Sequence, residues 1–139
     1  MKNFQSAAAI QANASVIWKI LTDAPAYASW NTTVNRVDGR IALGEKVTVH
    51  VKINPGRAFA VTVTEFTPER RMVWTGGMPL KLFKGERTFT LTPGTAGSVE
   101  FQMKEVYSGL MSRLIVRSIP DLQPAFDEFA TCLKREAER

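Results

Sequence analysis

A stripe of apolar residues in the C-terminal segment, residues 109–139, constrains the fold more than any other feature of the chain. Most of its members recur three or four residues apart, which is the spacing of one face of an α-helix. They are Met111, Leu114, Ile115, Ile119, Leu122, Phe126, Phe129, Ala130 and Leu133. The stripe predicts either one long helix kinked by its prolines, or one helix to about Arg117 and a longer one from about Pro120. A helix of this length can lie across a whole sheet.

The body of the chain ahead of this segment alternates apolar and polar residues, as β-strands do. A first strand is expected at residues 3–10, followed by a helix at 15–23 with Asn13 or Ser15 as its N-cap and a helical turn at 26–30. Six further strands are expected at residues 33–41, 45–53, 58–66, 70–76, 84–93 and 98–107. Short turns between successive strands predict an antiparallel sheet, and the fold class is therefore α+β.

The glycine- and proline-containing segment 75–83 interrupts the strand pattern and is expected to form a flexible loop with apolar residues at its tip. Such a loop beside a binding site can act as a gate, or it can simply pack down onto the body of the protein. The sequence leaves both possibilities open.

Length and charge limit the classes of function. A chain of 139 residues fits one domain, here residues 1–139. The net charge is +5, but Lys and Arg are scattered and not interleaved with aromatics, so nucleic-acid binding is not expected. No apolar run approaches the ~20 residues of a membrane-spanning helix. We expect a soluble cytoplasmic protein, and the sequence does not indicate its oligomeric state.

Residue types that hold metals or cofactors are sparse. His50 is the single histidine and Cys132 the single cysteine, so the usual zinc-ligand sets and an intramolecular disulfide are excluded. His50 is expected on an exposed strand face and Cys132 in the apolar core. The chain has no G-x-S-x-G motif, and Gly76-Gly77 and Gly94 lack the context of a phosphate-binding loop. No metal or cofactor is expected.

Two charged residues fall on the apolar faces of predicted strands. Glu105 shares the spacing of two with Phe101 and Met103, and Arg87 shares it with Phe89. A charge on an apolar face is costly unless it is paired, so an Arg87–Glu105 pair is the simplest arrangement. The pair could orient a polar group of a ligand or be purely structural, or Glu105 could act as an acid or base on a bound carbonyl compound.

The order of elements, strand, two short helices, six strands and a long terminal helix, resembles the helix-grip (SRPBCC) superfamily. This superfamily includes START lipid-transfer domains, polyketide cyclase/dehydrase-like proteins and pathogenesis-related ligand binders. The resemblance covers the whole chain and rests on diffuse motifs: SVIWKILTDAPAYASWN, RMVWTGG, GERTFTL and MKEVYSGLM. It implies a curved antiparallel sheet of about seven strands around the C-terminal helix, with an internal cavity. It does not imply one activity, because one fold serves many functions.

The inward strand residues and the terminal helix supply the expected ligand-contacting set. Its members are Trp30, Val49, Val51, Phe59, Val61, Trp74, Phe83, Arg87, Phe89, Phe101, Met103, Glu105, Met111, Leu114, Ile115 and Ser118. The preferred hypothesis is a carrier that binds a small hydrophobic or amphipathic molecule. The alternatives are a cyclase/dehydratase-like enzyme in which Glu105 or Tyr107 moves protons, and a chaperone-activator-like module that docks a protein. Whether the protein is an enzyme stays open.

Overall fold

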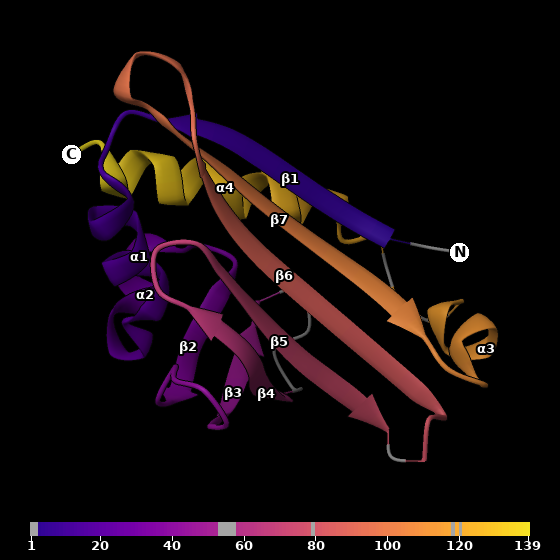
Figure 1. The fold of residues 1–139 in the computed structure, drawn as a ribbon. Helices are drawn as coiled ribbons and strands as arrows, with labels where there is room; N and C mark the ends of the chain where they lie inside the picture. The colour runs from indigo at the N-terminus through magenta and orange to yellow at the C-terminus, as the bar shows by residue number, and fades with distance from the viewer. Residues whose placement is uncertain (1–2, 53–57, 79, 118, 120) are drawn as a thin grey trace.

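Seven strands form one antiparallel sheet in the computed structural model, which describes residues 3–52, 58–78, 80–117, 119 and 121–139. The strands are β1 (Asn3–Ile10), β2 (Val34–Gly39), β3 (Lys46–Val51), β4 (Ala58–Thr67), β5 (Arg71–Met78), β6 (Phe83–Pro93) and β7 (Val99–Ser108). Their order is β1-β7-β6-β5-β4-β3-β2, so each strand from β2 to β7 pairs with its neighbour in sequence, and β1 joins the far edge beside β7 (Figure 1). The predicted α+β architecture with a curved sheet is confirmed.

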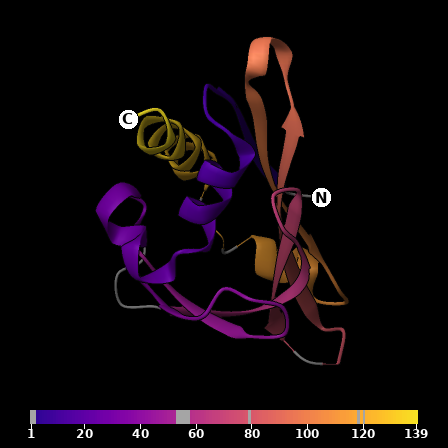
Figure 2. The same cartoon turned by 60° about the vertical axis from the view of Figure 1, so that its left-hand side comes forward.

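The helices lie in two parts of the chain, one between β1 and β2 and the other after β7. α1 (Ala14–Thr22), the 3₁₀ turn η1 (Ala24–Ala26) and α2 (Tyr27–Trp30) follow β1, whereas α3 (Ser112–Val116) and α4 (Gln123–Ala137) follow β7. The 3₁₀ turn η2 (Thr95–Gly97) joins β6 to β7. Figure 2 shows the sheet curling so that α1, α2 and α4 lie on its concave side. None of the helices in the described ranges is long and apolar enough to cross a membrane.

The C-terminal segment contains two separate helices that lie at different places on the sheet. α4 runs beside β1, while α3 lies at the far ends of β6 and β7 (Figure 1). The single-helix alternative is therefore wrong. Pro124 occupies the first turn of α4, where its missing N–H is harmless, so it starts this helix instead of kinking one. Ser118, which was predicted to contact a ligand, and Pro120, near which the second helix was predicted to begin, lie outside the described residues.

The start of α1 differs from the prediction in its capping. Asn13 is the N-cap residue and has the extended backbone of one, but its side chain makes no capping hydrogen bond, and Ser15 lies inside the helix. The helix is held instead by its buried side chains Ile17, Trp18 and Leu21. The phenol of Tyr27 donates to the Leu21 carbonyl oxygen at the end of α1, which ties α2 to α1. This helix is therefore stabilised by the packing of its buried side chains and not by a side-chain cap.

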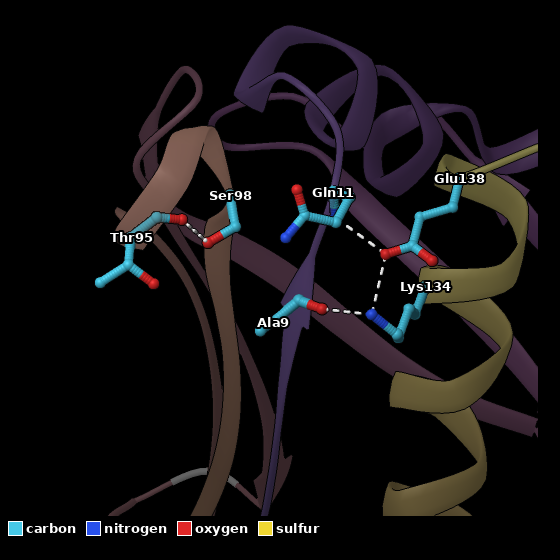
Figure 3. Close-up of polar contacts among 6 residues, drawn as sticks. All are labelled: Ala9, Gln11, Thr95, Ser98, Lys134 and Glu138. Atoms are coloured by element: carbon cyan, nitrogen blue, oxygen red, sulfur yellow. Dashed lines mark hydrogen bonds and ion pairs between the residues drawn. The ribbon is translucent and has the colours of Figure 1, made fainter.

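α4 also covers the free edge of β1 with polar side chains. Lys134 donates to the Ala9 carbonyl oxygen, and the Gln11 N–H donates to Glu138 Oε2 at 2.8 Å (Figure 3). Near the start of β1, Gln123 Nε2 donates to the Gln5 carbonyl oxygen, 2.6 Å away. Covering an edge strand with a helix satisfies backbone groups that would otherwise be open to pairing with another chain.

The core fills the concave side of the sheet. The register pairs Leu91 with Phe101 and Phe89 with Met103 across β6 and β7, and these side chains are almost completely buried. The alternation of strand residues explains this burial, because residues two apart point to the same face. The strand faces predicted from the sequence are therefore confirmed for these two strands.

Candidate ligand-binding site

Arg87 and Glu105 form an ion pair on the concave face of the sheet. They are direct partners in the β6–β7 register, and Arg87 Nε lies 3.0 Å from Glu105 Oε1. Their side chains are 22% and 16% exposed, so the pair sits at the boundary of the core. The predicted pairing is confirmed. Its role towards a ligand stays a prediction.

Two aromatic residues complete this polar group. The Tyr107 hydroxyl donates to Glu105 Oε2, so both oxygens of the carboxylate accept hydrogen bonds. The guanidinium carbon of Arg87 lies 4.7 Å from the ring centroid of Phe126 on α4, in a cation–π arrangement. The group thereby connects β6 and β7 with α4. We call Arg87, Glu105 and Tyr107 the polar triad.

Tyr107 acts as a hydrogen-bond donor in this arrangement. Burial raises the pKa of its phenol well above the ordinary value, and the neighbouring Glu105 carboxylate raises it further. The phenol is therefore protonated at neutral pH. The spacing of two between Glu105 and Tyr107 placed both on one face in the sequence, but their hydrogen bond depends on a side-chain conformation that the pattern does not encode.

One of two aligned glycines lies against the Tyr107 ring. Gly85 is opposite Tyr107 in β7 and opposite Gly76 in β5. A Cβ atom at Gly85 would lie 3.4 Å from the ring, and the ring of Phe83 stacks on Tyr107 with centroids 5.8 Å apart. Glycine in a strand often marks such a close approach. Gly76 was predicted to lie in a flexible loop at residues 75–83, but β5 continues to Met78, so the loop is shorter than predicted.

The deeper predicted contact residues form a packed aromatic cluster together with Tyr27 and Phe129, which were not predicted to contact a ligand. We define this cluster as Tyr27, Trp30, Trp74, Phe89, Phe101 and Phe129. Ring centroids lie 4.7 Å apart for Trp74 and Phe89, 5.5 Å for Trp30 and Phe129, and 6.1 Å for Phe101 and Phe129. These residues and Met103 are at most 7% exposed. Side chains therefore occupy this part of the space between sheet and α4. The indole N–H groups of Trp30 and Trp74 are buried there without a partner in the part of the chain described.

The remaining predicted contact residues lie where the concave face becomes accessible. We call this region the open end, and it comprises Val51, Phe59, Val61, Met78, Phe83, Gly85 and α3. Val51, Val61 and Phe83 are half-buried, and so are Met111 beside α3 and Ile115 within it, whereas Val49 is buried. Phe59 is 41% and Leu114 is 62% exposed, so Leu114 faces solvent. The polar triad lies between the aromatic cluster and the open end.

Two surface hollows lie elsewhere. One of about 460 Å³ is lined by Ala7–Ala9 of β1 and by Asp127, Ala130, Thr131 and Lys134 of α4. The other, of about 420 Å³, is lined by residues of β4 to β7 that include Thr64, Arg71, Val73 and Thr88. Neither is lined by a residue that the sequence predicted to contact a ligand.

His50 and Cys132 have structural surroundings. His50 Nε2 lies 2.9 Å from Asp38 Oδ2, and its side chain is 25% exposed, so it is less open than predicted. The hydrogen bond from His50 is the main cause that lowers the pKa of the Asp38 carboxyl, and Arg36 contributes. Cys132 is buried, with Sγ 3.3 Å from Thr32 Oγ1. Among the residues described, no three His, Cys, Asp or Glu side chains are grouped to hold a metal ion.

Comparisons with solved structures show the same fold. An aromatase/cyclase (Zhui) from Streptomyces sp. R1128 superposes with a TM-score of 0.73 at 14% identity, covering 99% of this chain and 94% of that chain. A START superfamily protein from Mycobacterium smegmatis gives 0.70 at 16% identity, covering 98% and 97%. The Aha1 protein from Colwellia psychrerythraea, solved as a dimer, gives 0.74 at 18% identity, covering 99% and 97%. A comparison with curated protein sequences found no match.

The sequence itself matches one family model. Residues 1–138 match the family described as polyketide cyclase / dehydrase and lipid transport, which is almost the whole chain. The family agrees with the sheet, the C-terminal helix and the START-like neighbours in structure. The chain therefore belongs to the polyketide cyclase/dehydrase and lipid transport family.

Proposed function

We propose that the protein binds a small hydrophobic or amphipathic molecule at the open end, with the polar group of the molecule held by the polar triad. The observation that carries this proposal is the Arg87–Glu105 pair, which is largely buried on the concave face and borders half-exposed apolar side chains. A binding site of this kind combines apolar lining with a few polar groups that set orientation.

Arg87 is the residue best suited to contact the ligand. Its Nε donates to Glu105, while a guanidinium has further N–H groups on its two terminal nitrogens. Glu105 and the Phe126 ring fix the side chain, so little conformational entropy is lost when a ligand binds. A carboxylate, phosphate or carbonyl oxygen matches these donors, and the apolar part of the ligand would lie along Val51, Val61 and Phe83.

A cyclase- or dehydratase-like enzyme is the second candidate, favoured by the protonated Tyr107 phenol next to Glu105. The arrangement supports this role less well than binding. Both Glu105 oxygens already accept hydrogen bonds from Arg87 and Tyr107, so fewer lone pairs of the carboxylate are left for a proton of a substrate. Tyr107→Phe separates the two candidates, because it removes the proton donor and leaves Arg87 and the apolar lining in place.

Native mass spectrometry with laurate as probe tests the proposal. Laurate combines a carboxylate with an apolar chain, and organic extraction of the purified protein would identify any molecule already bound. We expect Arg87→Met to weaken laurate binding about ten-fold or more, the usual effect of losing a charge-assisted hydrogen bond. Arg71→Met is the matched control, because Arg71 pairs with Glu65 at an exposed position outside the triad.

The control should bind laurate like the unsubstituted protein. Circular dichroism shows that each variant is folded before binding is compared. Equal laurate binding by the Arg87→Met variant and the unsubstituted protein would refute the anchoring role of the triad.

A further inference from the structure

Two segments that lack acidic residues meet at the open end. The chain has 13 Asp and Glu residues, yet none lies in residues 70–85 or 106–120. The first segment contains the connection from β5 to β6, and the second contains the connection from β7 to α3. They are joined by a hydrogen bond from the Leu110 N–H to the Lys81 carbonyl oxygen, 3.1 Å long. Figure 1 shows both at the end of the sheet opposite α1 and α2.

These connections expose large apolar side chains. Leu80 and Leu110 are each 84% exposed, Leu114 is 62% and Met78 is 45%. They are four of the seven large hydrophobic residues exposed in the described part of the chain. The predicted alternative that segment 75–83 packs down onto the body is therefore wrong for its tip. Exposed apolar residues that cluster, instead of being scattered singly, mark interaction surfaces.

The backbone at this tip is unfavourable for the residues it carries. Leu80 and Lys81 have φ angles of 62° and 58°, so two successive residues with a Cβ atom adopt the left-handed conformation. Glycine, asparagine or aspartate usually occupies such positions, because larger side chains are strained there. The sequence instead places an apolar and a cationic side chain here, and both are exposed. Strain of this kind is concentrated at functional sites.

The same two segments carry exposed cations close in sequence to the leucines. Lys81, Arg113 and Arg117 are exposed, and Lys84 lies nearby with its ammonium 3.6 Å from Glu86. We call the set Leu80, Lys81, Leu110, Arg113, Leu114 and Arg117 the basic leucine patch. Leucines flanked by Lys and Arg suit the interface of an anionic bilayer, where apolar side chains enter the acyl region and cations meet lipid phosphates.

We propose that the basic leucine patch docks the protein on anionic lipid membranes. The charge complementarity comes from the exposed Lys81, Arg113 and Arg117 together with the absence of carboxylates from both segments. Docking would hold the open end against the bilayer, since β6 runs directly from Phe83 beside the patch to Arg87 in the polar triad. A ligand could then pass between the membrane and the site without crossing bulk water. The inference goes beyond the proposed function, because membrane docking does not require that a ligand be bound.

Flotation with lipid vesicles tests the docking surface. The unsubstituted protein should float with phosphatidylcholine vesicles that contain phosphatidylglycerol, bind vesicles of phosphatidylcholine alone more weakly, and dissociate as salt is raised. The Leu80→Ser/Leu110→Ser variant should bind the vesicles about ten-fold or more weakly, because two leucine side chains would no longer be buried in the bilayer. Leu43→Ser is the matched control, since Leu43 is 63% exposed on the β2–β3 connection. It should bind like the unsubstituted protein.

Charge variants provide an independent measurement. Lys81→Gln/Arg113→Gln should lower affinity for the anionic vesicles by roughly five-fold per residue and flatten the salt dependence. The control pair Lys19→Gln/Arg135→Gln, whose side chains are also exposed and lie on α1 and α4, should change binding by much less. Equal losses in the two charge variants, or in the Leu43→Ser control and the patch variant, would overturn the assignment of the patch.

Failure to bind either kind of vesicle would also overturn it. Analytical ultracentrifugation would then show whether the patch joins two copies of the chain, in which case Leu80→Ser/Leu110→Ser dissociates a dimer. Laurate binding without vesicles keeps the two proposals separate. The patch variant should bind laurate within about two-fold of the unsubstituted protein, since no patch residue belongs to the triad. Vesicle binding without laurate binding would refute the proposed function and leave the docking surface standing.

Discussion

The aromatic cluster and the open end lie on the same strands but differ in nearly every physical property. Towards α4, β6 and β7 carry Phe89 and Met103, which are completely buried. Two residues further along, the same strands carry Arg87 and Glu105, and beyond these come Gly85 and Tyr107. One half of the concave face therefore supplies most of the core, and the other half keeps polar and half-exposed groups on a rigid support.

This difference separates stability from binding. The aromatic cluster holds α2 and α4 against the sheet, so changes there should affect unfolding. The side chains at the open end are only partly buried, so changes there should affect ligand binding and should lower the free energy of unfolding only a little. The following predictions measure the two sides of this comparison against each other, and the last of them concerns the edge of β1, which lies outside both regions.

The largest effect is expected within the aromatic cluster. Phe129 contacts the rings of Tyr27, Trp30, Phe89 and Phe101, and it is 3% exposed. Phe129→Ala should lower the free energy of unfolding by about 3–5 kcal/mol, because it leaves a cavity among rings that cannot collapse fully. Urea denaturation measures this loss.

The matched substitution at the open end is Phe59→Ala, at a position that is 41% exposed. It should cost less than about 1 kcal/mol. Equal losses for Phe59→Ala and Phe129→Ala would contradict the division of the concave face.

An intermediate effect is expected at the polar triad. Arg87→Met or Glu105→Gln alone should cost about 2 kcal/mol, because each leaves the other group partly buried without its partner. The double variant should cost less than the sum of the two, and a double-mutant cycle by urea denaturation measures this coupling.

The exposed pair Arg71–Glu65, whose side chains are 49% and 45% exposed, provides the reference cycle. Its coupling should stay below about 1 kcal/mol. A stronger coupling there than at the triad would contradict the special position of Arg87 and Glu105.

The stability of the protein at high pH should depend on two tyrosines, Tyr27 in the aromatic cluster and Tyr107 in the polar triad. Tyr27 and Tyr107 are the only tyrosines, and burial raises the pKa of both phenols well above 10. A raised folded pKa means that the stability each contributes is complete below the unfolded pKa of about 10 and is lost as pH rises from there towards the folded pKa. The free energy of unfolding should fall by up to about 1.4 kcal/mol per pH unit for each tyrosine.

Ultraviolet titration of phenolate absorption checks this prediction. Both tyrosines should ionise only when the protein unfolds, and Tyr107→Phe should remove one of the two from the titration. Ionisation of either tyrosine near pH 10 in the folded protein would show that its surroundings are more open than in the structure.

The smallest effect is expected at the covered edge of β1. The Gln11 N–H and Lys134 hold the Glu138 carboxylate, and these hydrogen bonds lower the pKa of Glu138 (Figure 3). The contact should be present above the unfolded pKa of about 4 and be lost as pH falls through the lower folded pKa. Glu138→Gln should speed hydrogen exchange at the Gln11 amide, as measured by NMR. Glu136→Gln, which breaks only the contact with Arg139, should leave that amide unchanged.

The sequence predicts which face of a strand each side chain occupies. It does not predict how deeply that side chain is buried at its position along the strand. The spacing of two placed Arg87 and Glu105 on the apolar face and predicted their pairing. The same spacing treated Phe89 and Phe83 alike, although one is buried in the aromatic cluster and the other half-exposed at the open end. Periodicity specifies which face a side chain occupies. Burial along that face depends on where α4 lies, and this is set by contacts between residues far apart in sequence.

The C-terminal segment and the β5–β6 hairpin show two further limits. The apolar stripe continues through Leu114, but Leu114 faces solvent because α3 is separated from α4 and lies at another place on the sheet. Gly76 and Gly77 look like a loop because glycine has low strand propensity. Their strand is stabilised by pairing with β6, and the aligned Gly85 lies against the Tyr107 ring, a contact between strands that no local pattern reveals.

Methyl NMR during a laurate titration tests the central claim most directly, namely that ligand binds at the open end while the aromatic cluster stays packed. The methyl signals of Val51, Val61 and Ile115 should shift on binding, whereas those of Val47 and Leu133, which are completely buried, should change little. Arg87→Met should abolish these shifts at the same laurate concentration, and Arg71→Met should not. Shifts centred on Val47 and Leu133, or confined to Val73 on the convex face, would contradict the account.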